Sequence, residues 1–213
     1  MGGPVFRPVR GLSVAVAVLI GLYTLLVLIT AGWMWSLKGV YNDYLDGVAT
    51  VDELDAAATS GTGLAVGIAL VFIPTVVVAV MWLWRARSNA ELANPLAVHH
   101  WDKGAAIWGW LPVVNFWVPR RVVLDIVRAG VPGVTASAVN LWWGSWLAFL
   151  VLERLGGQAV DPDSSFFDMD SAVWIATFAA LLCVGAAVGF LHIVRRVTAW
   201  ETNPATYRQP DPA

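Results

Sequence analysis

Three histidines are the side chains in this chain that come closest to metal or acid–base chemistry. His99 and His100 are adjacent, Asp102 follows two residues later, and His192 lies far along the chain. Imidazole and carboxylate groups bind zinc and other transition metals. However, adjacent side chains diverge on a regular backbone, and no C-x-x-C or H-E-x-x-H motif accompanies them. We therefore expect no metal and no other cofactor, keep these four residues as the metal candidates, and assign no catalytic residue.

Four long apolar segments must position any functional side chain. They cover about residues 12–35, 64–84, 134–152 and 172–194. As a helix, each is long enough for a hydrocarbon core of about 30 Å. The chain is 58% hydrophobic and only 13% charged, whereas soluble domains are about 25% charged. The sequence thus predicts an all-α integral membrane protein with four transmembrane helices, built as a single membrane domain over residues 1–213.

The charged residues predict how these helices are oriented. In a four-crossing arrangement, 11 of the 13 basic residues share one side and 10 of the 15 acidic residues share the other. Basic loops stay in the cytoplasm, so we expect a cell-membrane protein whose two termini and centre (residues 85–133) are cytoplasmic. The 11 basic residues are Arg7, Arg10, Arg85, Arg87, Lys103, Arg120, Arg121, Arg128, Arg195, Arg196 and Arg208. The 10 acidic residues are Asp43, Asp46, Asp52, Glu53, Asp55, Glu153, Asp161, Asp163, Asp168 and Asp170.

The cytoplasmic centre contains an apolar segment that is too short to cross. Residues 104–118 would be about 22 Å long as a helix, and Pro112 and Asn115 interrupt them. This pattern predicts a re-entrant or interfacial segment, and the sequence leaves both alternatives open.

An amphipathic helix is predicted to follow this segment, starting at Pro119 and ending at Gly130. Its helical spacing places Arg121, Asp125 and Arg128 on one face, with its valines and isoleucine turned away. Basic residues next to tryptophans at a membrane surface suit anionic headgroups or a protein partner, and lipid is a nearer partner than nucleic acid. The predicted contact residues are Trp108, Trp110, Trp117, Arg120, Arg121 and Arg128.

Polar residues within or beside the bilayer are the remaining site candidates. Asn115, Asn140 and His192 are predicted to be intramembrane polar residues. Asn140 shares a small-residue face with Ser137, Gly144 and Ala148, and His192 shares one with Gly185 and Gly189. Such faces predict close helix packing inside one chain, and a homo-oligomer or a membrane-protein partner stays open.

Three blocks of this sequence resemble the bacterial membrane-protein family called domain of unknown function 4328. They are WLWRARSNAELANP (residues 82–95), GWLPVVNFWVPRRVVLDIVRA (residues 109–129) and LWWGSWL (residues 141–147). The resemblance covers about residues 61–200, and the chain has Asp125 where the family more often has Glu. It implies a multi-pass membrane protein and supplies no activity, substrate or catalytic residue.

Three functional interpretations follow. The first is a non-enzymatic membrane scaffold that binds anionic lipid or a protein partner at its cytoplasmic face. The second is a small transporter or channel component whose path is lined by residues 104–118. The third is a membrane enzyme or metal-binding protein that uses the histidines of the cytoplasmic side.

Overall fold

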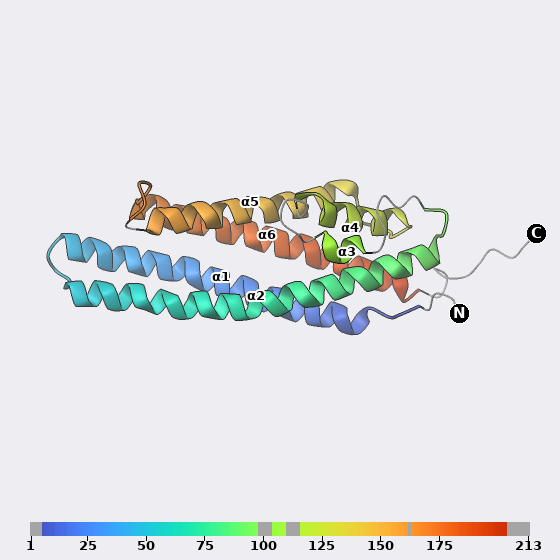
Figure 1. Cartoon of the computed structure of the whole chain (residues 1–213), viewed down its shortest axis with the longest axis horizontal. Helices are drawn as coiled ribbons and strands as arrows, with labels where there is room; N and C mark the ends of the chain where they lie inside the picture. The colour runs from blue at the N-terminus through green and yellow to red at the C-terminus, as the bar shows by residue number, and fades with distance from the viewer. Residues whose placement is uncertain (1–5, 98–103, 110–115, 162, 204–213) are drawn as a thin grey trace, which may run out of the picture. The chain divides into compact units, whose positions relative to one another are not determined.

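The computed structural model of the chain is all-helical over the residues it describes, which are 6–97, 104–109, 116–161 and 163–203. The helices are drawn in Figure 1. In chain order they are α1 (Arg10–Leu45), α2 (Val51–Ala93), α3 (Ala105–Trp108), α4 (Val118–Arg128), α5 (Ala136–Val160) and α6 (Met169–Glu201).

Three of these helices, α1, α2 and α6, are long and apolar enough to cross a membrane. The protein is therefore a multi-pass membrane protein. The predicted third crossing, residues 134–152, falls almost entirely within α5, which is long enough but is not among the three. Its polar residues Ser137, Asn140 and Ser145 reduce the hydropathy of the segment, so the structure does not confirm a fourth crossing.

The long helices extend beyond the apolar segments that predicted them. α1 continues ten residues past Trp35, and α2 begins 13 residues before Leu64. A capping box explains where α2 begins: the Thr50 backbone N–H donates to Glu53 Oε2 (2.7 Å), and the Glu53 N–H donates to Thr50 Oγ1 (3.3 Å). At the start of α6, Asp168 accepts hydrogen bonds from the Asp170 N–H (3.1 Å) and from the Ser171 hydroxyl.

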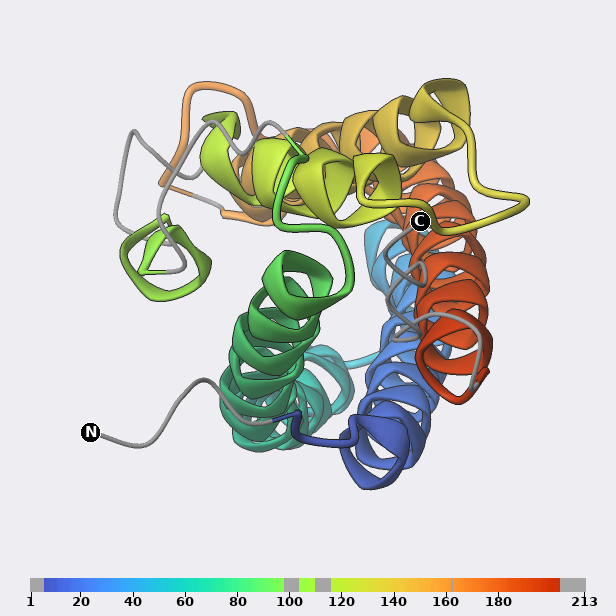
Figure 2. The same ribbon diagram turned by 90° about the vertical axis from the view of Figure 1, so that its right-hand side faces the viewer.

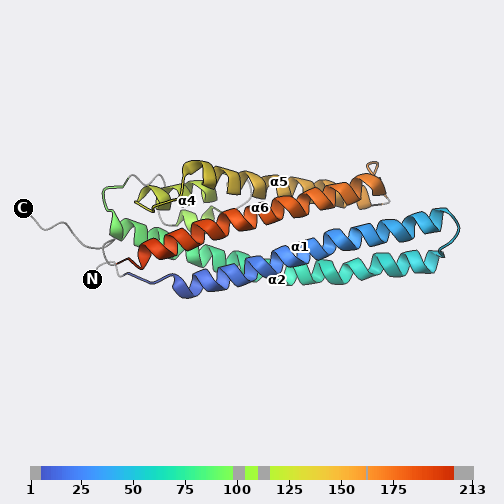
Figure 3. The same ribbon diagram turned by 180° about the vertical axis from the view of Figure 1, so that it is seen from behind.

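The described chain forms two compact units, and each long helix contributes a stretch to both. The first unit comprises residues 1–18, 75–143 and 188–213, and the second comprises residues 19–74 and 144–187. Figure 3 shows α1 and α6 from the side opposite to Figure 1.

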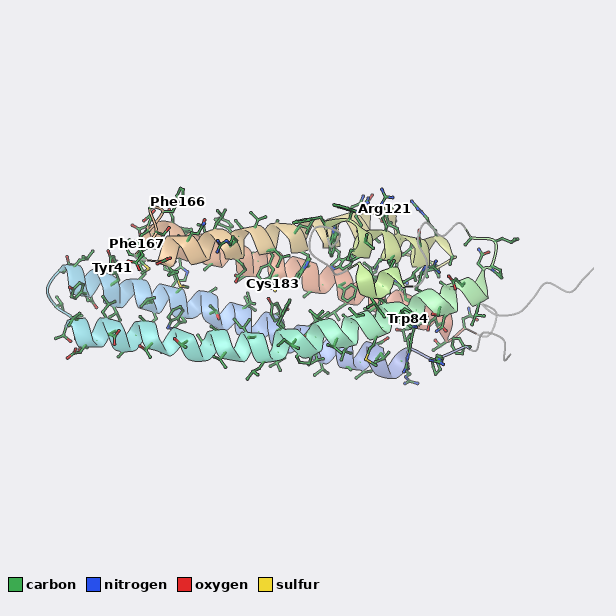
Figure 4. The ribbon with its side chains drawn as sticks, viewed as in Figure 1. Tyr41, Trp84, Arg121, Phe166, Phe167 and Cys183 are labelled. Atoms are coloured by element: carbon green, nitrogen blue, oxygen red, sulfur yellow. The ribbon has the colours of Figure 1, made fainter. Side chains whose placement is uncertain are left out.

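The second unit is held together by apolar clusters and aromatic pairs. Val27 and Phe149 belong to one cluster, and Met34 and Leu37 belong to another, so α1 contributes to both. The ring of Tyr41 meets that of Phe167 edge-on, with 6.1 Å between centroids. Both residues are labelled in Figure 4. Lys38 of α1 forms an ion pair with Asp170, in the first turn of α6.

Trp33 packs closely against α2 in the same unit. Its indole N–H lies within hydrogen-bonding distance of the Ala57 carbonyl (3.3 Å) and Ser60 Oγ (2.9 Å). A β-carbon added at Gly61 would lie 2.4 Å from the Trp33 ring. Gly61 therefore allows the indole to lie against the α2 backbone.

The first unit has an aromatic core where α2, α5 and α6 meet. Trp82 is fully buried and meets Phe190 edge-on at 5.7 Å, and Phe190 stacks on Trp142 at 4.8 Å. A β-carbon at Gly189 would lie 3.0 Å from the Trp142 Cβ. Gly189 of α6 thus packs against α5 inside one chain. In the second unit, a β-carbon at Gly185 of α6 would lie 3.7 Å from Ser145 Oγ of α5, so this position of the predicted small-residue face also lies against α5.

The small-residue face of α5 was predicted to pack in the same way, and this prediction is wrong for the described chain. Ser137, Asn140, Gly144 and Ala148 are all exposed. Helix periodicity places these residues on one face, but only the positions of the other helices decide which face is covered.

Candidate functional site

The basic helix α4 lies where the sequence predicted it, between Val118 and Arg128. Pro119 occupies its first turn, where the absence of a backbone N–H costs no hydrogen bond. Gly130 follows its end with φ of +124°, a conformation that L side chains rarely adopt. Figure 2 shows α4 beside the first turns of α5.

The three arginines of α4 differ in how they are held. Arg120 Nε donates to Asn140 Oδ1 of α5 at 2.7 Å. Arg121 is exposed and points away from the helix in Figure 4. Arg128 is about half exposed, with Nη1 3.8 Å from Asp125 Oδ1. α4 therefore presents two exposed guanidinium groups and one that a hydrogen bond holds in place.

Asp125 was predicted to share the exposed face with Arg121 and Arg128, and this prediction is wrong. Its side chain is only 1% exposed, and Val122, Val123, Leu124 and Ile126 are buried with it. The surrounding chain thus covers α4 on more sides than a surface helix with one apolar stripe would need. Asp125 belongs to the anchoring of α4 rather than to its exposed surface.

Aromatic residues continue the exposed surface at the start of α4. Phe116 and Trp117 are 59% and 43% exposed. The Phe116 carbonyl accepts a hydrogen bond from the buried Trp143 indole N–H (2.8 Å), which fixes this turn to α5. Trp108 is the last residue of α3, and Trp110 and Asn115 lie outside the described residues.

Of the predicted metal candidates, only His192 lies within the described chain, because His99, His100 and Asp102 fall outside it. The exposed His192 has Nε2 3.3 Å from the Gly133 carbonyl oxygen. Within the described residues, no group of three His, Cys, Asp or Glu side chains is arranged to hold a metal ion.

A buried polar network, which the sequence did not predict, lies in the first unit. Ser13 Oγ accepts a hydrogen bond from the Trp82 indole N–H (2.9 Å) and lies 2.7 Å from Thr198 Oγ1 and 3.1 Å from the Val9 carbonyl. One hydroxyl therefore joins α1, α2 and α6. Nothing in the sequence distinguishes Ser13 from other serines in apolar segments, so only the fold identifies it.

Asn89 of α2 extends this network to the segment before α1. Its Oδ1 accepts from the Arg7 backbone N–H (3.2 Å), and its Nδ2 donates to the Arg7 carbonyl (2.8 Å). Asn89 is 1% exposed. Its neighbour Arg87 is also 1% exposed and forms an ion pair with Glu91 at 3.0 Å.

Glu201, seven residues after the last apolar segment, is the least expected member of this region. Its side chain is only 4% exposed, and neither carboxyl oxygen has a hydrogen-bond partner within the described chain. Burial therefore raises the pKa of Glu201 to about 8. The Asn89 amide and the Val9 backbone N–H lower that pKa in part, although neither meets hydrogen-bond geometry with the carboxyl group.

One of the comparisons with known proteins identifies a family for this chain. No curated protein and no solved structure is significantly similar to this chain. The family described as Domain of unknown function (DUF4328) matches residues 46–199, a range that contains α2 to α5 and almost all of α6. Since this match covers well over half of the 213 residues, the chain belongs to the DUF4328 family.

Proposed function

We propose that the protein is a non-enzymatic membrane scaffold that binds anionic lipid headgroups through α4. The binding surface, called here the α4 surface, consists of Phe116, Trp117, Arg120, Arg121 and Arg128. The exposed Arg121 and Arg128 on α4, together with the exposed Phe116 and Trp117 at the start of the helix, are the observation that carries this proposal. Aromatic rings suit the interface between hydrocarbon and headgroups, and guanidinium groups suit phosphate.

The hydrogen bond between Arg120 and Asn140 supports the same function. A guanidinium with five donors retains free donors after Nε has been used. Asn140 thus holds Arg120 in one orientation, which lowers the conformational entropy lost when an anion binds. Asn140 is exposed beside α4, so its position fits this role better than a bridge between buried helices.

The proposal includes the orientation argued from the basic residues. α5 would be the fourth crossing, both termini would be cytoplasmic, and the α4 surface would meet the inner leaflet. That leaflet is rich in anionic lipid, and each arginine near it contributes about 1 kcal/mol of binding free energy.

Replacing Arg120, Arg121 and Arg128 together with glutamine tests the lipid site. In nanodiscs that contain anionic lipid, we expect the affinity for anionic headgroups to fall about 150-fold, because three arginines at roughly 1 kcal/mol each contribute about 3 kcal/mol. Native mass spectrometry of retained lipids measures the effect. A charge-matched control replaces the exposed Arg10, Arg195 and Arg196 with glutamine.

The control separates a specific site from a general positive charge. An equal loss in both variants would mean that the arginines act only as topology signals. An unchanged lipid profile in the α4 variant would instead make the α4 surface a contact for a protein partner or a second copy.

The transporter and metal-binding interpretations gain no support from the described chain. The transport path would depend on Pro112 and Asn115, and the metal site on His99, His100 and Asp102. These residues lie outside the described range. We therefore propose neither function.

A further inference from the structure

The segment before α1 is hydrogen-bonded to α2, close to the end of that helix. We call residues 6–9 the N-terminal strap. Both backbone polar groups of Arg7 are hydrogen-bonded to the Asn89 side chain, and the Val9 carbonyl accepts from Ser13. Val9 is 1% exposed, whereas Pro8 beside it is exposed. The strap is thus held at its backbone and at one apolar side chain.

Glu201 lies at the point where the strap meets α2 and α6. Among the described residues, the polar groups that influence its carboxyl group are the Asn89 amide and the Val9 N–H. Asn89 also holds Arg7, and Val9 is the buried residue of the strap. A carboxylate in this place would have no hydrogen-bonded counterpart among the described residues, and an ionised carboxyl group is strongly disfavoured in such surroundings.

The charged side chains on the same elements do not relieve this burial. Arg7 and Arg10 are exposed, and Arg87 is ion-paired with Glu91. On α6, Arg195 and Arg196 are exposed. None of these charges contributes to the pKa shift of Glu201, whose causes within the described residues are burial and the two neutral donors.

We infer that Glu201 is a proton-binding site that controls the N-terminal strap: the neutral acid is covered by the strap, and loss of its proton to water releases residues 6–9. This inference is independent of the proposed lipid function, because the strap and Glu201 share no residue with the α4 surface. The site takes a proton rather than a metal cation, since the neighbouring polar groups are N–H donors and not oxygen ligands.

The direction of the pH dependence follows from the two protonation states. Burial places the pKa of Glu201 at about 8 when the strap is closed, against an ordinary value of 4.5 when it is open. Between these values the closed state binds one more proton than the open state. The ratio of closed to open strap therefore falls about tenfold per pH unit from about 4.5 to about 8, and is constant outside this window.

Cysteine accessibility in the full-length protein tests the inference. Cys183, which is the single native cysteine, is first replaced with serine, and Val9→Cys is then introduced with either Glu201 or Glu201→Gln. Pro8→Cys, at an exposed position, corrects for the pH dependence of the thiol itself. We expect the Val9-to-Pro8 ratio of maleimide labelling rates to rise at least about tenfold between about pH 6 and about pH 9 with Glu201.

Glutamine at position 201 has nearly the same shape as the neutral acid but does not ionise. The Val9-to-Pro8 ratio of labelling rates should therefore not change with pH in Glu201→Gln. A rise of equal size in Glu201→Gln, or a flat ratio in both proteins, would overturn the inference. Deuterium exchange of the Arg7 amide, compared between the native chain and Glu201→Gln after correction for intrinsic rates, repeats the test without cysteine at position 9.

Discussion

At the scale of single residues, the position of the Trp33 indole determines which glycines of α2 can be replaced without a steric clash. Gly61 and Gly63 lie two residues apart on α2, so they face different sides of the helix. A β-carbon at Gly61 would meet the Trp33 ring at 2.4 Å, whereas a β-carbon at Gly63 would meet nothing within 4 Å. The ring cannot move away without losing the hydrogen-bonding positions near Ala57 and Ser60.

We therefore predict opposite effects for alanine at these two positions. Gly61→Ala should lower the free energy of unfolding by about 1–3 kcal/mol, the usual cost of overpacking. Gly63→Ala should leave it unchanged or raise it by up to about 1 kcal/mol, because alanine favours helix. Thermal unfolding in detergent, followed by tryptophan fluorescence, measures both. Equal stability of the two variants would show that Trp33 repacks freely.

At the scale of elements, the Ser13 hydroxyl connects α1 to α2 and α6. Ser13→Ala should lower the free energy of unfolding by about 1–3 kcal/mol, because the fully buried Trp82 N–H loses its acceptor. Ser36→Ala, at an exposed position of the same helix, should change it by less than about 0.5 kcal/mol. Chemical denaturation of both variants in the same micelles measures the difference. A neutral Ser13→Ala would mean that Trp82 finds another acceptor.

The sequence predicted the elements best where local chemistry determines them. Pro119 and Gly130 correctly bracket α4, and the apolar segments locate α1, α2 and α6. Hydropathy could not predict how far these helices continue, because helical hydrogen bonds form equally well in polar segments. The Thr50–Glu53 capping box was a readable signal for the start of α2.

The candidate sites were only partly predictable, because burial depends on distant parts of the chain. Spacing placed Asp125 with the exposed arginines, yet the packing of other elements buries it. Glu201 follows two arginines in sequence, a context that favours exposure, and its burial arises where α2 and the N-terminal strap meet. Neither outcome can be derived from helical periodicity alone.

At the scale of the whole molecule, the proposed topology has a direct test. In a Cys183→Ser background, single cysteines replace Asp52, Asp163 or Ser88. An impermeant maleimide applied to intact cells should label the first two positions and spare the third, because basic loops remain cytoplasmic. Lysed cells, in which all three positions should react, serve as the control. Labelling at position 88 in intact cells would reverse the orientation.

The hydroxyl of Ser13 also limits how far the chain can be shortened from its N-terminus. The family match begins at residue 46, one residue after α1 ends. Yet Ser13 supplies the acceptor for Trp82, and Val27, Met34 and Leu37 belong to the apolar clusters. A chain shortened to the matched range would lose all the core residues that α1 contributes. The range matched by the family is thus shorter than the chain needed to complete the core, and α1 belongs to the folding unit.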